Sequence, residues 1–197
     1  MTPAADELAD ALRRLLDAVP RTTADEATLH DAHELVEAAV ALLEADAREG
    51  APPVHLSAFR HAFSLVTGTA HPVAPPVRLT TDESGVHGTF RLGHRHEGAP
   101  GLSHGGILCL VLDHVLGEAG MAAGVGGMTV GLDVRFVAPT PINADLEVAC
   151  RVEGVDGRKV RLAGEIRYDG KPTVTASAVF VQIDEATAER LFPQRIA

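Results

Sequence analysis

Hydrophobic residues follow two different periods along this chain, and the first is helical. Leucines and valines recur at helical spacing from Leu8 to Val19 and again from Leu35 to Leu43. Thr23-Ala-Asp-Glu26 has the spacing of a capping box that would start the second helix, and Gly50 with the following Ala-Pro-Pro would end it. We therefore predict an acidic helical hairpin over residues 1–50, with one apolar stripe.

The second period is that of strands, and it begins at Pro76. VRLTTDESGVHGTFRLG predicts two short strands, and three or four longer alternating strands follow after residue 128. Turns at Asp156-Gly157 and Asp169-Gly170 have the residues that two-residue hairpins favour. Between these strands lies one apolar helix, from about Gly105 to Met121. Residues 51–75 are a Pro-rich connector with a short helical candidate from Ser57 to Leu65, and residues 185–197 are a short C-terminal tail.

The apolar helix determines the fold class. A helix that is apolar nearly all the way round must be covered on every side, and a single antiparallel sheet curled around it would do this. The order of elements therefore predicts an α+β layer arrangement over residues 76–184. Such a sheet would have exposed edge strands, which favour pairing between two copies of the chain.

Charge narrows the classes of partner. The formal net charge is −10, and residues 1–50 hold 12 of the 27 acidic residues but only 4 of the 17 basic ones. Nucleic-acid binding needs clustered Lys and Arg, so the composition argues against nucleic acid as a partner. The acidic face of the hairpin is either a solvated lid or packing arm, or a docking surface for another protein.

The expected location is cytoplasmic. The first residues are acidic where a signal peptide needs positive charge, and the longest apolar run, Ile107–Leu112, is too short to span a bilayer. Cys109 and Cys150 are too few and too far apart for a disulfide framework or a Cys-based zinc site. We interpret both thiols as core residues and expect a soluble protein without a membrane partner.

The start of the apolar helix carries the first candidate chemistry. His104, Gly105 and Gly106 follow a turn-forming Ala-Pro-Gly, so the first amides of the helix are unpaired beside residues without side chains. These free donors and the positive end of the helix dipole favour negative charge. When water attacks an acyl thioester, such charge develops on the carbonyl oxygen, and one donor contributes about 3 to 4 kcal/mol. These residues are a candidate oxyanion hole.

Asp113 is the second candidate, because it interrupts the apolar run of the same helix. It lies seven residues after Gly106 and shares a stripe with Gly106, Leu110 and Gly117, about 10 Å along the axis. Burying an unpaired carboxylate is costly. Asp113 is therefore either satisfied by a hydroxyl or Arg from a neighbouring strand, or it lines a pocket as a base or nucleophile.

Thr129 opens the strand that follows the helix. Strict alternation puts it on a polar face with Asp133 and Arg135, opposite Val130 and Phe136. A hydroxyl there could hold a water beside a carboxylate, but Thr is also simply a good strand former. The residues alone leave both interpretations open.

Together these residues resemble a known family. The chain has HGGxxxxxxD from His104 to Asp113, EGxPG before it, Thr129 sixteen residues after the Asp, and R-F-x-x-P at a strand end. This combination is similar to hotdog-fold acyl-CoA thioesterases of the phenylacetyl-CoA thioesterase (PaaI-like) type, over residues 76–184. The resemblance implies a hotdog fold and a homodimer or dimer of dimers, with an active site for acyl-CoA at the dimer interface.

The resemblance also implies roles for individual residues. The Gly105 amide would polarise the thioester carbonyl, with His104 shaping the turn. Asp113 would act as general base on water, or as nucleophile through a mixed anhydride, and Thr129 of the other protomer would position the water or the carboxylate. No cofactor is implied, because CoA is part of the substrate. The implied substrate-binding residues are Gly106, Arg135, Arg158 and Lys159.

The chain departs from the family pattern at Glu97 and Gly98, where many relatives carry Asn or Gln. Either that role is filled elsewhere or activity is weak. One alternative function is a hotdog hydratase or dehydratase, but that chemistry typically has a His five residues after an Asp, whereas His114 is adjacent to Asp113. Another is a non-catalytic acyl-CoA-binding or scaffold protein with this fold.

A metal site is a further alternative. His94, His96 and His104 lie close together in the sequence, and His30 and His33 lie one turn apart on a predicted helix. No carboxylate or other ligand has convincing spacing to either set. We therefore expect no metal.

Overall fold

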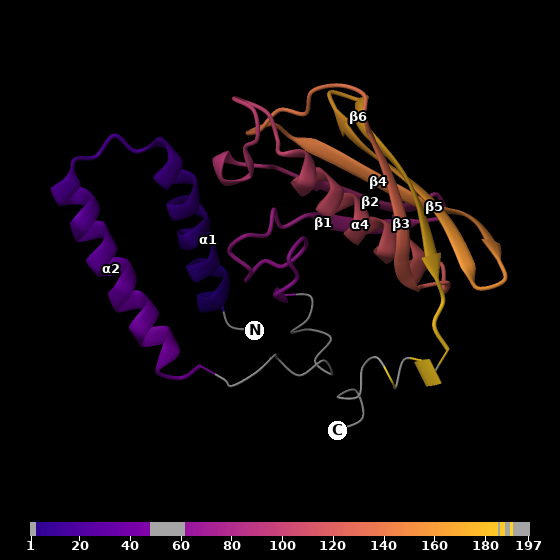
Figure 1. Ribbon diagram of the computed structural model, residues 1–197, viewed down its shortest axis with the longest axis horizontal. Helices are drawn as coiled ribbons and strands as arrows, with labels where there is room; N and C mark the ends of the chain where they lie inside the picture. The colour runs from indigo at the N-terminus through magenta and orange to yellow at the C-terminus, as the bar shows by residue number, and fades with distance from the viewer. Residues whose placement is uncertain (1–2, 48–61, 185, 188–189, 191–197) are drawn as a thin grey trace.

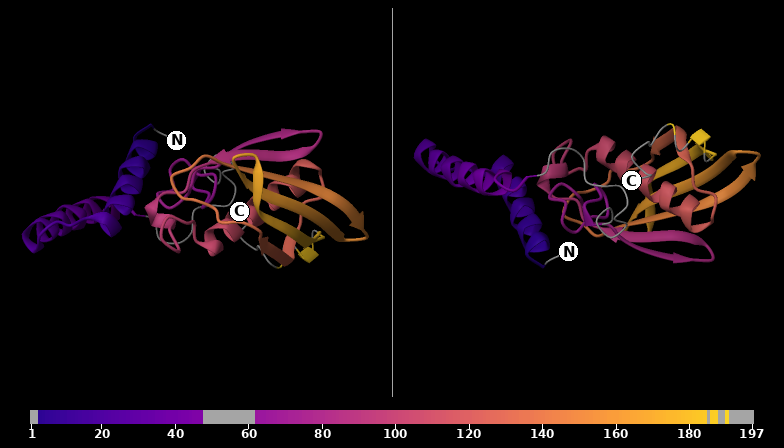
Figure 2. Two further views of the ribbon diagram at one scale, coloured as in Figure 1. Left: turned by 90° about the horizontal axis from the view of Figure 1, so that it is seen from above. Right: turned by 90° about the horizontal axis from the view of Figure 1, so that it is seen from below.

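The structure is a computed structural model that describes residues 3–47, 62–184, 186, 187 and 190. It has two parts, an N-terminal pair of helices and a sheet with one helix packed on it (Figure 1). Figure 2 shows the helical pair extending to one side of the sheet.

Six antiparallel strands form one sheet in the order β1-β2-β4-β5-β6-β3. The predicted turns join β4 to β5 and β5 to β6, and Gly157 and Gly170 adopt positive φ angles of 56° and 69° there, which glycine does without steric cost. β1 and β3 form the two edges. The strands are β1 (Arg78–Asp82), β2 (Gly85–Phe90), β3 (Met128–Phe136), β4 (Leu146–Asp156), β5 (Lys159–Tyr168) and β6 (Lys171–Val181).

The apolar helix is α4 (Gly105–Ala122), and it packs on one face of this sheet. Val111, Leu112, Val115 and Leu116 are fully buried in a single core with apolar side chains of the sheet. The predicted α+β hotdog arrangement, with an antiparallel sheet around one central helix, is confirmed.

One flank of α4 is only partly covered by the described residues, contrary to the expectation of burial on every side. Gly106, Leu110, Asp113 and Gly117 share a stripe, and none of them is buried. Asp113 therefore interrupts the apolar run on the half-buried flank of α4 that faces the β3 edge of the sheet. This placement explains how a carboxylate fits into an otherwise apolar helix.

By length and composition α4 also has the character of a membrane-spanning helix, with a mean hydropathy of 1.4 over 18 residues. This 18-residue window is longer than the uninterrupted apolar run Ile107–Leu112 on which the sequence-based expectation rested. Its buried residues recur every three or four positions against the sheet, as in Leu108, Leu112, Val115 and Ala119. The apolar composition of α4 is thus explained by its place as the core helix.

The N-terminal helices are α1 (Pro3–Ala18), which a short turn η1 (Val19–Arg21) follows, and α2 (Glu26–Glu44). α1 lies between α2 and the sheet domain (Figure 1). Every residue of α2 is exposed, whereas Arg13 of α1 is buried with 8% of its surface exposed. The two predicted helices therefore differ in their attachment, because α1 packs on the described part of the sheet domain and α2 does not.

The start of α2 differs from the predicted capping box. The N-cap is Asp25, whose Oδ1 accepts a hydrogen bond from the Thr28 amide at 2.9 Å. Thr23 lies too early, because the helix begins at Glu26 and the residue directly before it takes the cap. α2 ends at Glu44, and the predicted stop at Gly50 lies outside the described residues.

Part of the predicted connector packs into the core. Val66, Ala70 and Ala74 are buried, with at most 6% of their surface exposed, and Val66 belongs to the hydrophobic core. The predicted helix over residues 57–65 and the tail over 185–197 lie largely outside the described residues. The segment before β1 is therefore an integral layer of the sheet domain from Val66 onward.

Candidate active site

The N-terminus of α4 is capped by His104. Its backbone is extended (φ −65°, ψ 130°), and its Nδ1 accepts a hydrogen bond from the Gly106 amide at 3.0 Å. The His104 carbonyl accepts from the amides of Ile107 and Leu108 at 3.0 and 3.3 Å. The bond from Leu108 is the first regular bond of the helix, which leaves the amides of residues 104–107 without a regular helical partner. Three of these four are satisfied, because the His104 amide also donates to the His96 carbonyl at 2.8 Å.

Gly105 supplies the remaining amide. No described residue accepts a hydrogen bond from it. Gly105 is half-buried, and the Phe136 ring lies so close that a Cβ added at Gly105 would come within 3.1 Å of Cζ. One donor at the positive end of the helix dipole is therefore free for an anionic oxygen. Gly106, predicted to bind substrate, has its amide occupied by His104 in this structure.

The loop before His104 is built around Glu97. One oxygen of its carboxylate accepts from the Gly101 amide, and the other lies 3.1 Å from His94 Nδ1. The hydrogen bond from the Gly101 amide has the largest effect on the pKa of Glu97, and together with the one to His94 it holds that pKa below its usual range. His94 Nε2 in turn lies 3.2 Å from Asn143 Nδ2. Glu97 is thus engaged in shaping the loop.

Gly98 explains the departure from the family pattern at this position. A Cβ on Gly98 would come within 2.9 Å of His104 Cα. With this backbone, no Asn or Gln side chain fits at residue 98. The close approach of the loop to His104 therefore requires a glycine there.

Asp113 and Thr129 form a direct pair within one chain. The Thr129 hydroxyl donates to Asp113 Oδ1 at 2.9 Å. The carboxylate is half-buried and Thr129 is exposed. The resemblance implied that Thr129 comes from the other protomer, whereas here the two side chains share one chain. Asp113 Oδ2 has no hydrogen-bond partner among the described residues.

A β-bulge brings Thr129 to the acid. Thr129 pairs with Phe180 while Gly131 pairs with the very next residue of β6, Val179, so Val130 is an additional residue in β3. The bulge reverses the alternation before it, and Thr129 shares the helix-facing side with Leu132. The predicted polar face for Thr129 is therefore wrong, since strict alternation would have turned its hydroxyl away from α4.

The donor and the acid of one chain are far apart. Gly105 and Asp113 are eight residues apart on a regular helix, which separates them by about 12 Å along the axis. Both groups must approach within hydrogen-bond distance of one reacting thioester to act together. A single chain cannot combine its own Gly105 amide with its own Asp113.

The predicted CoA-binding residues lie toward opposite ends of the sheet, with Arg135 alone on the edge strand β3. Arg135 is near the C-terminal end of β3, 80% exposed in its side chain and 3.6 Å from Asp133 Oδ1. Arg158 lies in the turn before β5, and its Nε donates to the Gln182 carbonyl at 3.0 Å. Lys159 pairs in the sheet with Val181. The structure brings Arg158 and Lys159 together and leaves Arg135 apart.

Neither cysteine thiol is suited to act as a nucleophile. Cys150 is 3% exposed in β4, and burial raises the pKa of its thiol to about 12. Cys109 of α4 is half-buried, and burial raises its pKa as well. Both thiols are protonated at neutral pH, and only the thiolate is a good nucleophile.

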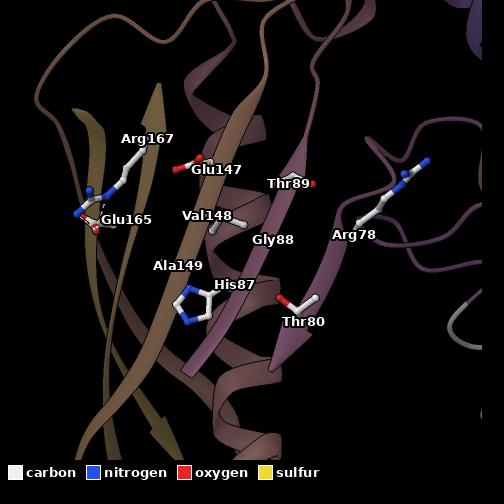
Figure 3. Close-up of a pocket in the computed structure, with 10 residues that line it drawn as sticks. All are labelled: Arg78, Thr80, His87, Gly88, Thr89, Glu147, Val148, Ala149, Glu165 and Arg167. Atoms are coloured by element: carbon white, nitrogen blue, oxygen red, sulfur yellow. Dashed lines mark hydrogen bonds and ion pairs between the residues drawn. The ribbon is translucent and has the colours of Figure 1, made fainter. Parts of the chain in front are cut away.

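Another hollow lies on the outer face of the sheet, over β1, β2, β4 and β5 (Figure 3). It encloses about 570 Å³ and contains no residue predicted for the site. Its charges are partly paired, because Arg167 lies 2.6 Å from Glu165. Among the described residues no group of three His, Cys, Asp or Glu side chains is arranged to hold a metal ion.

Similar proteins are known for this chain, although no family model matches it. A crystal structure of a thioesterase superfamily protein is 36% identical, with a TM-score of 0.84 over 92% of each chain. Acyl-coenzyme A thioesterase THEM4 of Xenopus laevis is 31% identical over 96 residues, which are 48% of this chain and 43% of that protein. A hypothetical thioesterase of Streptococcus pneumoniae, solved with coenzyme A, shares the fold at 17% identity and a TM-score of 0.50 over 53% of this chain and 87% of that chain.

The extent of these matches differs. The stretch similar to THEM4 spans less than half of that protein. The match to the thioesterase superfamily crystal structure is so extensive that it must include most of α1 and α2 as well as the sheet domain. The N-terminal helices are therefore a shared feature of the two structures.

Proposed function

We propose that this chain, which belongs to the thioesterase superfamily, hydrolyses acyl-CoA thioesters to the free acid and coenzyme A. The observation that carries the proposal is the 2.9 Å hydrogen bond from Thr129 to Asp113 on the half-buried flank of α4 beside β3. A carboxylate oriented by a hydroxyl, with its second oxygen free, is suited to take a proton from water. The names of the similar proteins support the same reaction.

In the proposed mechanism the carbonyl oxygen of the thioester accepts a hydrogen bond from the Gly105 amide. Water attacks the carbonyl carbon while Asp113 Oδ2 takes one of its protons. The C–S bond then breaks, and Asp113 returns the proton to the leaving thiolate. In the alternative path Asp113 attacks the carbonyl carbon and the C–S bond breaks, which gives a mixed anhydride and the CoA thiolate. Water then hydrolyses the anhydride to the free acid and the Asp113 carboxylate, and one proton of that water goes to the thiolate. Thr129 holds Oδ1 in both paths.

The site is completed by a second copy of the chain. Because about 12 Å separates Gly105 from Asp113 along one helix, the donor of one protomer would act with the acid of its partner. The β3 edge offers a surface for such pairing, since Val130 is 63% exposed and Phe136 is 56% exposed. We propose a homodimer with two such composite sites, either alone or doubled to a dimer of dimers.

The CoA portion of the substrate would contact basic residues near the ends of β3. Arg158 donates to Gln182 through Nε, and no other described residue is bonded to its terminal nitrogens, which would meet a phosphate. Lys159 is its neighbour and would add a second positive charge. Arg135 would meet the pantetheine or phosphate of CoA from the other end of the strand.

A thiol-release assay with a panel of acyl-CoA esters tests the proposal. We expect the wild-type chain to release free CoA from at least one ester, with the Asp113→Asn variant as the control for activity of contaminants. Binding of acyl-CoA without release of thiol would instead support the non-catalytic scaffold function. Formation or loss of a double bond in the acyl chain, detected by its absorbance, would support a hydratase or dehydratase.

A further inference from the structure

We infer that helix α1 positions the oxyanion donor, with Asp17 as the positioning residue that holds the turn before His104. The inference rests on the proposed function, because it gives the N-terminal helix a part in arranging that same site. It follows from a short series of contacts that begins at Asp17, passes through the turn η2 (His94–His96) and ends at the Gly105 amide.

The first contact joins α1 to η2. Asp17 Oδ1 accepts from the Arg95 amide at 2.9 Å, and Asp17 Oδ2 accepts from Arg95 Nη1. The two side chains are only 25% and 11% exposed. Gly93 permits this approach, because a Cβ there would lie 2.6 Å from Asp17 Oδ1. Asp17 thus holds both the backbone and the side chain at the centre of η2.

The second contact joins η2 to the start of α4. The His104 amide donates to the His96 carbonyl at 2.8 Å. His96 is 2% exposed, and its Nε2 lies 3.0 Å from the Val73 carbonyl. His96 therefore holds the amide of His104, whose side chain and carbonyl cap the helix. Gly105 is the next residue, so its amide direction depends on the same turn.

The charge of Asp17 matters beyond its hydrogen bonds. Burial lowers the pKa of Arg95, Asp17 opposes this shift, and the nearby Arg13 adds to it. Removing the negative charge would leave two guanidinium groups close together, with less compensation. η2 would then be held less firmly and could move relative to His104.

α1 has a separate attachment to the sheet domain, which makes a clean test possible. Arg13 Nη2 donates to the carbonyls of Gly68, Thr69 and His71 at 3.1, 2.6 and 2.8 Å. The Thr69 hydroxyl donates to Asp6 Oδ1 at 2.8 Å. These contacts do not involve Asp17. We therefore expect Asp17→Asn to loosen η2 while α1 stays in place.

The test compares Asp17→Asn with Asp10→Asn in the full chain. Asp10 is on the same helix, pairs with Arg13 and is 64% exposed in its side chain, so the control removes the same charge without contact to η2. We expect Asp17→Asn to lower kcat about tenfold, because small displacements of a catalytic group are costly. KM should change by less than about twofold, and Asp10→Asn should change neither.

Hydrogen-deuterium exchange gives a readout that does not depend on activity. Asp17→Asn should accelerate exchange in the segment 97–108 and leave β4, β5 and β6 as in the wild type. Exchange and kcat equal to those of Asp10→Asn would overturn the inference. A wild-type chain without thiol release would overturn the proposed function, and the exchange comparison would still decide whether Asp17 holds this turn.

Gly93→Ala is a second variant that keeps every charge. Its backbone is extended (φ −96°, ψ −172°), so alanine is allowed, and its Cβ would push against the Asp17 carboxylate. If Asp17→Asn unfolds the whole chain, Gly93→Ala decides the question. Faster exchange in 97–108 with a lower kcat supports the inference, and wild-type values in both overturn it.

Discussion

Replacing Asp113 by Asn is expected to lower kcat by at least about 10²-fold, because an amide can neither take a proton from water nor form a mixed anhydride. The Asn side chain keeps an oxygen that can accept from the Thr129 hydroxyl, so the local packing stays the same. The measurement is steady-state thiol release from the best acyl-CoA ester. A thermal melt should show that the folded state is retained.

Thr129→Ala is the graded comparison for Asp113→Asn. It removes the hydroxyl that orients Oδ1 but leaves the carboxylate, so kcat should fall by less than in Asp113→Asn. If Asp113→Asn retained nearly the wild-type rate, Asp113 would have no part in the reaction. If Thr129→Ala had no effect, the hydroxyl would serve only the structure of the β3 edge.

Gly105→Pro is expected to lower kcat by about 10² to 10³-fold, because it deletes the one N–H assigned to the oxyanion. Proline suits this site for three reasons. Gly105 is the first residue of α4, where proline is favoured, no described residue uses its amide, and His104 has the extended backbone that proline requires before it. The helix should therefore form normally without the donor.

Gly105→Ala is the matched control for Gly105→Pro. It adds the same Cβ, which would lie 3.1 Å from Phe136 Cζ, but it keeps the N–H. The Phe136 ring is 56% exposed and can move, so we expect a small effect. Equal losses in the two variants would assign the effect to steric contact with Phe136. Wild-type activity in Gly105→Pro would exclude this amide as the oxyanion donor.

The sheet and its helix could be predicted from the sequence because they depend on local periodicity. Alternation over Leu146–Val152, hairpin turns at Asp156-Gly157 and the apolar run after Gly105 each determine an element without reference to distant residues. The N-cap role of His104 was also within reach, since it follows from the position of the helix start.

The contact between Thr129 and Asp113 could not be predicted from alternation. Alternation assigns every second residue of a strand to the same face. The additional residue Val130 in the bulge shifts this assignment by one position for the residues before it. Where a bulge falls depends on how β3 aligns with β6, about fifty residues later in the chain. The sequence therefore indicated the right residue types for the pair and the wrong side of the sheet.

The attachment of α1 to the sheet domain could not be predicted either, because the partners of α1 are distant in sequence and include main-chain atoms. Arg13 binds carbonyl groups more than fifty residues away, and Asp17 binds Arg95. Carbonyl groups have no signature in the sequence. The acidic composition of residues 1–50 indicated a solvated arm and gave no sign that α1 and α2 differ.

Gly105 and Asp113 of one chain lie eight residues apart and would serve different active sites of the dimer. Inactive variants at these two positions should therefore complement each other in a mixed dimer. A subunit with Asp113→Asn still has the Gly105 amide, and a subunit with Gly105→Pro still has the Asp113 carboxylate. If the two inactive proteins are unfolded together and refolded as random dimers, half of the dimers are mixed, and each mixed dimer regains one intact centre. Activity should then return to about one quarter of the wild-type value for a two-fold symmetric assembly.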